Sequence, residues 1–204
     1  LGSGTTYTTN DNIPVQLDGT TIFYVIYAKD DVDAPTTSNE QSYTVETPAV
    51  ATLPYKEVFA TDLSNTYTYS VIGDQEWVFG SFNSDTYAKM SGYSGSAQEN
   101  VDWLITPSFD FSGITNIIFY FDEAINYTGG VIADEQEVWI STNYKGIGNP
   151  DDAVWNKLTV TNRASGDSWT WVTVDGIDLS SYSGETNVHI GFKYTSTTSG
   201  ARTW

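Results

Sequence analysis

The sequence predicts an all-β protein that folds as a β-sandwich or a jelly roll. Short runs of β-branched and aromatic residues recur along the 204 residues, and each run is closed by Gly, Asn, Asp or Ser. Aromatic residues make up 15% of the chain, which is enough to fill a substantial core. No stretch has a convincing helical period. Many short strands without helices are typical of these two architectures.

The clearest pair of expected strands lies in residues 101–123. The first strand of the pair ends at Pro107, because proline cannot donate a hydrogen bond to a strand ladder. The second, 116–122, is a run of β-branched and aromatic residues, which favours a core strand. Farther along, Val138 and Ile140 are two residues apart and should share a face. Further strands are expected near 67–71, 76–79, 87–90, 103–106, 137–141, 155–160, 170–174 and 188–194.

The first 50 residues are expected to form a separate region. They contain a strand at 21–28, then an acidic loop and a short strand at 42–45. This order resembles the closing strands of bacterial Ig-like or fibronectin-type-III-like modules, which need about 100 residues for a whole sandwich. Residues 1–50 are therefore assigned to a partial Ig-like module and linker, and 51–204 to the jelly-roll domain. The predicted fold class is a jelly-roll β-sandwich preceded by a partial Ig-like β-sandwich.

Charge and composition exclude several classes of function. The formal net charge is −18, from 26 acidic and 8 basic residues, so the chain lacks the cations that neutralise nucleic-acid phosphates or bind anionic membranes. The sequence has no cysteine, which excludes disulfides and thiolate chemistry. No apolar run approaches the roughly 20 residues that span a bilayer, so no transmembrane segment is expected. The opening residues lack a signal-peptide pattern, which indicates a mature or partial chain.

A series of short motifs follows in order along the second region. They occupy residues 54–59, 102–112, 121–127, 139–144, 155–158, 177–184 and 190–196. In this order and spacing they resemble the choice-of-anchor J domains of secreted Bacteroidota proteins, which are related to the cleaved-adhesin modules of gingipain haemagglutinin regions. The resemblance implies a jelly-roll sandwich, an extracellular or cell-surface location and an adhesive or accessory role beside other modules. Export in this group often uses type IX secretion.

Two positions depart from the family pattern. Ala60 stands where the family commonly has an acidic residue after the Phe of its first strand. The family's last strand continues where this chain stops at Trp204, so the C-terminal strand is expected to be truncated. Related jelly rolls hold a calcium ion with acids from these two strands, and both departures weaken that implication.

Calcium is nevertheless the cofactor that the acidic residues suggest, because Ca²⁺ takes six to eight oxygen ligands. The candidate metal ligands are Glu57, Asp62 and Asp102, which fall at strand edges where loops could bring them together. The alternative is that all three are ordinary solvated acids.

Glycan binding is suggested by aromatic residues, whose planes stack on sugar rings. Trp169 and Trp171 are two apart, so they share a face if their segment is a strand. The other candidates, Tyr127, Tyr144 and Tyr182, lie in or beside expected turns. The alternative is that this set fills the core, as Trp103 is expected to do.

Catalytic patterns are weak. Glu135 and Glu137 would point the same way from a strand, as a glycosidase pair must, but Gln136 replaces the central acid of such motifs. The single histidine, His189, lies in a strand pattern, and the Gly-x-Ser-x-Gly elbow is absent from the sequence. We therefore assign no catalytic residue and predict that the chain is not an enzyme.

The predicted function is that of a non-catalytic adhesive or binding module of a larger secreted or cell-surface protein. Its expected partners are a glycan or a surface protein, together with other domains of the same protein. An accessory domain of a secreted multi-domain hydrolase and a structural spacer stay open as alternatives.

Overall fold

The computed structural model describes residues 20–29, 35–44, 49–127 and 132–204. The chain divides into two compact units, residues 1–47 and 48–204, and each is described by itself. The predicted domain boundary, after residue 50, lies close to this division.

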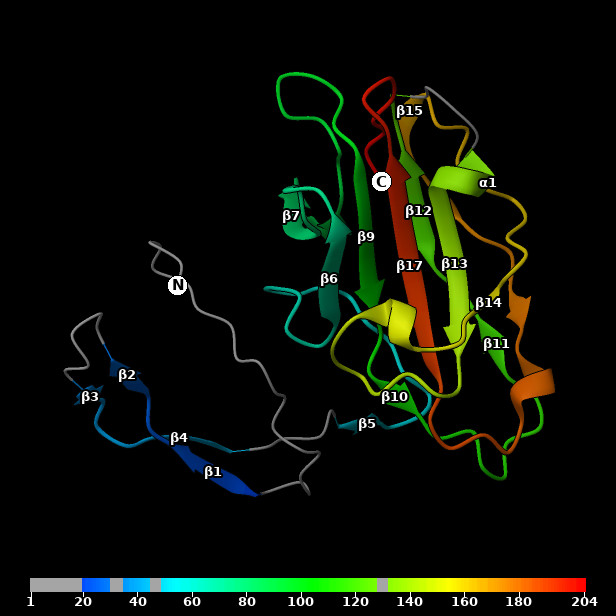
Figure 1. The fold of residues 1–204 in the computed structure, drawn as a ribbon. Coiled ribbons are helices and arrows are strands. Elements are labelled where there is room, and N and C mark those ends of the chain that lie inside the picture. Colours follow the sequence, from blue (N-terminus) through cyan, green and yellow to red (C-terminus); the bar gives the residue numbers. More distant parts are fainter. Residues whose placement is uncertain (1–19, 30–34, 45–48, 128–131) are drawn as a thin grey trace. The chain divides into compact units, whose positions relative to one another are not determined.

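Two antiparallel strand pairs make up the described part of the first unit (Figure 1). They are β1 (Thr21–Tyr24) with β4 (Gln41–Thr44) and β2 (Tyr27–Lys29) with β3 (Pro35–Thr37). The prediction of one strand over 21–28 is wrong. The strand is interrupted at Ile26, whose N–H donates to Ser38 Oγ and whose carbonyl accepts from the Ser38 N–H. The Ig-like assignment stays a prediction.

The second unit is built on a five-stranded antiparallel sheet (Figure 1). In spatial order its strands are β14 (Asn156–Lys157), β13 (Gln136–Ser141), β17 (His189–Ser196), β9 (Asn100–Ile105) and β6 (Tyr67–Ile72). The central strand, β17, pairs with β13 on one side and with β9 on the other.

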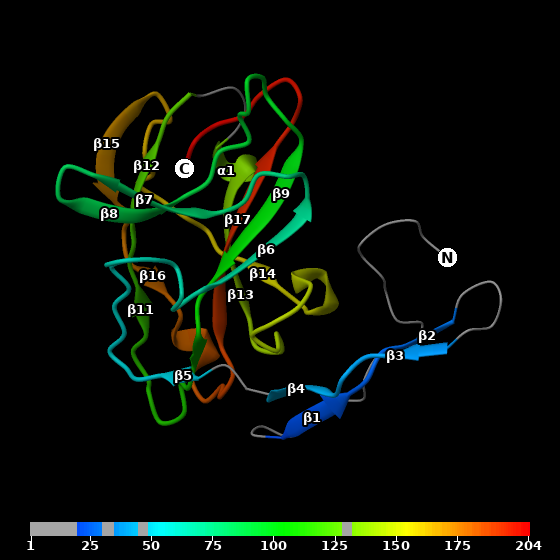
Figure 2. The ribbon, with the colours of Figure 1, turned by 90° about the vertical axis from the view of Figure 1, so that its left-hand side faces the viewer.

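Shorter strand pairs form the rest of the unit. They are β7 (Val78–Phe82) with β8 (Asp85–Lys89), β11 (Ile118–Phe119) with β16 (Ile177–Asp178), β12 (Asp122–Ile125) with β15 (Ser168–Thr173), and the parallel pair β5 (Val50–Ala51) with β10 (Ser108–Phe109). β11, β12, β15 and β16 make a second layer across the core from the five-stranded sheet (Figure 2). Helical segments in the described chain are short: α1 (Ile132–Glu135) and 3-10 turns at Pro150–Asp152 and Ser180–Tyr182. The prediction of an all-β sandwich is confirmed.

The strand predicted over 116–122 is interrupted in the structure. It forms β11 and β12, with Tyr120 and Phe121 between them outside the ladder. The alternation of side chains nevertheless continues through the break. Phe121 packs against the main core and stacks on Phe119, with ring centroids 5.4 Å apart, whereas Tyr120 is exposed. Core packing of alternate residues therefore continues across the break, where the Val174 N–H still donates to the Phe121 carbonyl at 2.9 Å.

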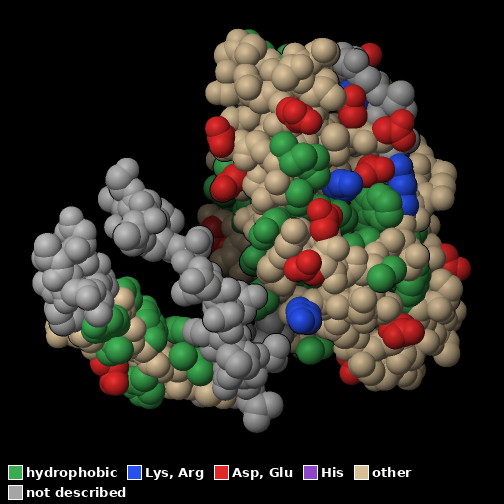
Figure 3. Space-filling view, in the orientation of Figure 1, with side chains coloured by type: hydrophobic (Ala, Val, Ile, Leu, Met, Phe, Trp, Pro, Cys, Tyr) green, Lys and Arg blue, Asp and Glu red, His purple; other side chains and the backbone are tan. Residues whose placement is uncertain are grey.

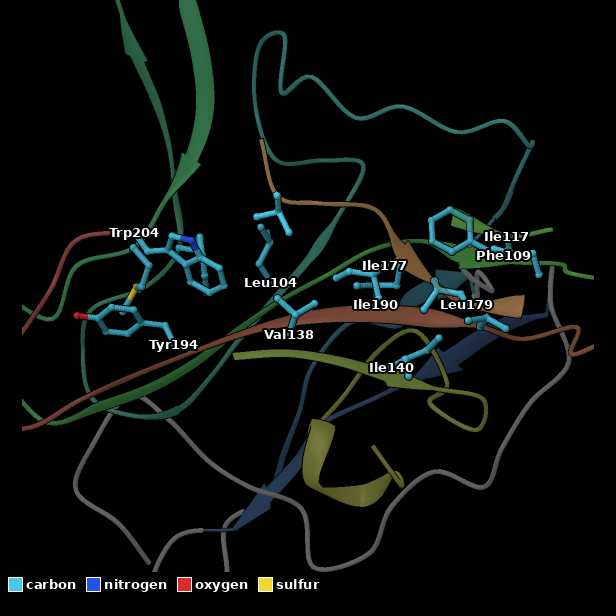
Figure 4. Packing of buried hydrophobic residues seen from close by; sticks show 14 of the residues in the cluster. Leu104, Phe109, Ile117, Val138, Ile140, Ile177, Leu179, Ile190, Tyr194 and Trp204 are labelled. Carbon is cyan, nitrogen blue, oxygen red and sulfur yellow. The ribbon is translucent and has the colours of Figure 1, made fainter. Parts of the chain in front are cut away.

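The core lies between the two layers (Figure 4). The five-stranded sheet contributes Leu104, Val138, Ile140, Ile190 and Tyr194. The second layer contributes Ile125 and Ile177, and the residues that directly follow its strands contribute Val174 and Leu179. Val138 and Ile140 are both buried in this cluster, as their spacing predicts, and Trp139 packs on the opposite face.

A second, smaller cluster covers that opposite face. Trp103, Ile105 and Tyr144 are buried in it, and Trp139 and Trp155 pack against them. The Trp103 and Trp155 rings are 4.9 Å apart, which is a close aromatic contact. The outer face of the sheet is therefore partly covered by its own aromatic side chains.

Gly191, in the middle of β17, makes room for this cluster. A methyl group at this position would lie 2.8 Å from ring carbons of Trp103 and 3.0 Å from Trp155. We expect Gly191→Ala to lower the free energy of unfolding by about 1–3 kcal/mol, as overpacking generally does. Urea unfolding followed by tryptophan fluorescence measures the change. A variant as stable as the wild type would show that both rings can shift without loss.

Candidate ligand-binding surface

Strand β15 presents two tryptophan side chains to solvent. Trp169 is 51% exposed and Trp171 is 44% exposed, whereas Val172 packs against the main core. The two indoles are two residues apart on one strand, so they lie on the same face. Exposure of two large apolar rings side by side is unusual for a surface that contacts only water.

Each tryptophan has a tyrosine partner from another part of the chain. The ring of Tyr127, which follows β12, lies 5.7 Å from Trp169 in an edge-on arrangement. The ring of Tyr87, on β8, lies 5.7 Å from Trp171. We call these four residues the aromatic surface. Tyr87 was not among the predicted site residues, because nothing in the sequence indicates that β8 lies beside β15.

Polar groups accompany the aromatic surface. Thr173 lies two residues beyond Trp171 on the same face, and its hydroxyl donates to Asp122 Oδ1 at 2.6 Å. Aromatic planes beside hydroxyl and carboxylate groups suit ligands that carry both apolar faces and hydroxyls. Acidic side chains are spread over the face of the five-stranded sheet seen in Figure 3, consistent with the net charge of −18. A net negative charge of this size disfavours anionic ligands.

Tyr144 and Tyr182 do not belong to this surface. Tyr144 is only 2% exposed, and its hydroxyl donates to the Gly148 carbonyl at 2.9 Å. The prediction that Tyr144 contacts a ligand is therefore wrong. Burial also raises the pKa of Tyr144 above its usual range. Tyr182 is half-buried against the main core in the 3-10 turn Ser180–Tyr182, at the opposite end of the unit from β15 (Figure 1).

Glu57 and Asp62 hold local backbone in place. The Glu57 carboxylate accepts from the Phe59 N–H at 2.6 Å and from the Tyr55 hydroxyl at 2.9 Å. Partial burial alone would raise the pKa of Glu57, but these hydrogen bonds lower it. The Asp62 carboxylate accepts from Ser64, which lowers its pKa.

The three predicted metal ligands do not form one site. Within the described residues, no group of three or more His, Cys, Asp or Glu side chains could hold a metal ion. The predicted set of Glu57, Asp62 and Asp102 is therefore wrong as a shared coordination sphere. Glu57 and Asp62 hydrogen-bond to the backbone next to them, whereas Asp102 lies on the core face of β9.

Asp102 is unlike the other two acids. It is 1% exposed, and neither carboxylate oxygen has a hydrogen-bond partner. It lies on the core face of β9, two residues from the core residue Leu104. Burial raises the pKa of Asp102 to about 7.

The carboxylates considered for glycoside hydrolysis are engaged elsewhere. Glu135 ends α1 and pairs with Arg202, whereas Glu137 lies on β13 and pairs with Lys157 at 2.6 Å. The expectation that both glutamates extend from one strand is therefore wrong. His189 is 1% exposed, and its Nδ1 lies 2.9 Å from the Thr106 carbonyl oxygen. Burial lowers the pKa of His189.

In the part of the chain that the structure describes, no helix is long and apolar enough to cross a membrane. No protein-family model matches the sequence, and no curated protein matches it either. The crystal structure of the K1 cleaved adhesin domain of Lys-gingipain from Porphyromonas gingivalis W83 is similar to it, with a TM-score of 0.46 and 15% identity. That match covers 72% of this chain and 90% of the gingipain domain.

Proposed function

We propose that the chain is a non-catalytic binding module and that the aromatic surface contacts its ligand. The observation that carries this proposal is the exposure of Trp169 and Trp171 on one strand face, each with a tyrosine ring packed beside it. The tyrosines limit the rotation of the indoles, so less conformational entropy is lost when a ligand stacks on them.

The ligand that fits this surface best is a neutral glycan. Sugar rings carry apolar C–H faces that stack on indoles, and their hydroxyls can bond to groups such as Asp122 and Thr173. A surface protein is the second candidate, because tryptophan and tyrosine are also enriched at the centres of protein interfaces.

The motif order along 54–196 supports the biological setting of the proposal. Its resemblance to choice-of-anchor J and cleaved-adhesin domains implies an extracellular or cell-surface protein with several modules. Weak single sites on such a protein would add up through multivalency. An accessory role beside a hydrolase, with binding at the same surface, stays the alternative.

Trp169→Ala tests the proposal. We expect loss of the stacked indole to weaken glycan binding by about 2 kcal/mol or more, roughly thirtyfold, as for an interface hot spot. The change in unfolding free energy should stay within about 0.5 kcal/mol, as for a surface substitution. A bound oligosaccharide is first identified on an array of neutral glycans, and its affinity for each variant is then measured by calorimetry.

Tyr93→Ala is the matched control, because Tyr93 is 62% exposed but lies outside the aromatic surface. It should bind glycan as the wild type does. Equal losses in both variants, or unfolding of Trp169→Ala, would overturn the proposal. Binding of a protein but of no glycan, lost on the same Trp169→Ala substitution, would assign the surface to a protein ligand.

A further inference from the structure

Strand β7 has a free edge on the side that faces away from β8 (Figure 2). Within the described residues, β8 is the only strand that pairs with β7. The chain that follows β8 has a neighbour on its other side, because Met90 and Trp204 exchange two backbone hydrogen bonds, at 2.8 and 2.9 Å. The free edge of the hairpin is therefore that of β7, and its backbone groups can pair with another strand.

The residues of β7 lack the features that normally protect an edge strand. The strand reads Val-Phe-Gly-Ser-Phe, without proline, lysine or any other charged residue. Val78 is 49% exposed, and Phe82, at 69%, is the most exposed large apolar side chain in the described part of the chain. Although the whole chain carries a net charge of −18, two copies that meet at β7 bring no like charges on the strand into contact.

The turn of the hairpin determines which backbone groups face the free edge. Residues 83–84 form a two-residue turn, and the residues that flank such a turn make a hydrogen-bonded pair. Hydrogen-bonded pairs alternate along an antiparallel ladder, so Phe82 and Gly80 bond to β8. The N–H and C=O groups of Phe79 and Ser81 consequently point away from β8, towards the free edge.

We propose that β7 pairs with β7 of a second copy, so that the chain forms a homodimer with its two-fold axis at Gly80. An antiparallel pairing about this axis places Phe79 of one copy opposite Ser81 of the other, and their outward groups exchange hydrogen bonds on both sides. The same register places Val78 opposite Phe82, an aromatic and β-branched pair that stabilises neighbouring strands. The sequence of β7 is therefore complementary to itself.

The dimer joins two aromatic surfaces on one side of a four-stranded sheet. A methyl group on Gly80 would lie 2.4 Å from the Tyr87 ring, so Val78 and Phe82 are on the same face as Tyr87. Tyr87 in turn contacts Trp171. A two-fold axis perpendicular to the sheet keeps this face on the same side in both copies, which would give the bivalence that weak ligand sites need. The dimer itself depends on the β7 edge and not on the ligand.

Engineered cysteines test the register of the pairing. The chain has no cysteine, so an introduced thiol is the only one in each copy. Val78 and Phe82 would form a non-hydrogen-bonded pair with Cα atoms about 4.5 Å apart, which a disulfide can bridge. An equimolar mixture of Val78→Cys and Phe82→Cys should therefore cross-link under mild oxidation. Either variant alone should not, because identical residues lie about 14 Å apart along the strands.

A mixture of Val78→Cys and Tyr93→Cys is the matched control, because Tyr93 is 62% exposed but lies outside β7. This mixture should give only the cross-linking of random collisions. Equal yields of the mixed disulfide in the two mixtures would overturn the proposal.

Sedimentation equilibrium of the 204-residue chain measures the association itself. Because two five-residue edges make a small interface, we expect a dissociation constant of about 10⁻⁵–10⁻⁴ M, which decreases as salt screens the net charge. Phe82→Lys should weaken the dimer at least about tenfold, since lysine protects an edge strand, whereas Tyr93→Lys should not. Circular dichroism checks that both variants are folded. A wild type that stays monomeric up to millimolar concentration, or a folded Phe82→Lys that dimerises as the wild type does, would show that the proposal is wrong.

Discussion

Replacing Glu123 with alanine will lower the free energy of unfolding by about 3–5 kcal/mol, the usual result of removing one partner from a buried ion pair. The Glu123 side chain is 1% exposed and accepts four hydrogen bonds. Two come from Arg163, at 3.1 and 2.7 Å, and the others come from the Ala164 N–H and the Trp204 Nε1, both at 3.0 Å. The substitution leaves a largely buried guanidinium without a counter-charge and two donors without an acceptor.

Urea unfolding of Glu123→Ala, Arg163→Met and the double variant measures this effect. The double variant should lose less stability than the sum of the two single variants, because it no longer leaves a buried charge unpaired. Glu185→Ala is a surface control, since Glu185 is exposed, and it should change stability by no more than about 0.5 kcal/mol. A loss below about 1 kcal/mol in Glu123→Ala would mean that water replaces the carboxylate.

Glu123 also supports the proposed ligand surface from beneath. It lies on β12, which pairs with β15, and the pairing of Ile125 with Ser168 precedes the exposed Trp169 by one residue. Tyr127, the partner of Trp169, follows two residues after Ile125. Glu123 therefore holds β12 to the segment at Arg163. β12 leads to Tyr127 and pairs with β15, which carries Trp169. Partial loss of glycan affinity in folded Glu123→Gln, whose side chain is not on the surface, would agree with this support.

Alternation of side chains made part of the fold predictable from sequence. Val138 and Ile140 fall in the core because a strand buries every second residue. The same rule places Trp169 and Trp171 together on the outer face of β15. Such local patterns do not show which strands become neighbours. The contact between Tyr87 and Trp171 joins residues far apart in sequence, so it could not be read from the chain.

Tyr144 and Asp102 show where local patterns mislead. Tyr144 stands between Asn143 and Lys145, a composition typical of an exposed turn, but its ring is buried against Trp155 at 5.4 Å. Its burial depends on a connection that folds back onto the sheet. Asp102 is two residues from Leu104, so alternation itself predicts a core-facing carboxylate. The expectation of a strand-edge acid at Asp102 is therefore wrong.

Raising the pH will destabilise the protein through Asp102, and Asp102→Asn will remove that loss of stability. Burial raises the pKa of Asp102 to about 7, whereas the unfolded chain has the ordinary value near 3.9. Between these values the folded state binds more protons than the unfolded state, so stability falls as pH rises. At about 1.4 kcal/mol per pKa unit the loss is at most about 4 kcal/mol, complete above pH 7 and absent below pH 4.

The asparagine variant should therefore match the wild type near pH 4 and exceed it in melting temperature by a margin that grows up to pH 7–8. Thermal unfolding across this pH range measures the margin. Asp110→Asn is a control of opposite sign, because the side chain and N–H of Ser112 lower the pKa of exposed Asp110. The small stabilisation of the folded state by ionised Asp110 is present at neutral pH and is lost as the pH falls. A margin for Asp102→Asn that does not change with pH would show that this carboxylate titrates normally, because only a raised pKa makes the stability gain depend on pH.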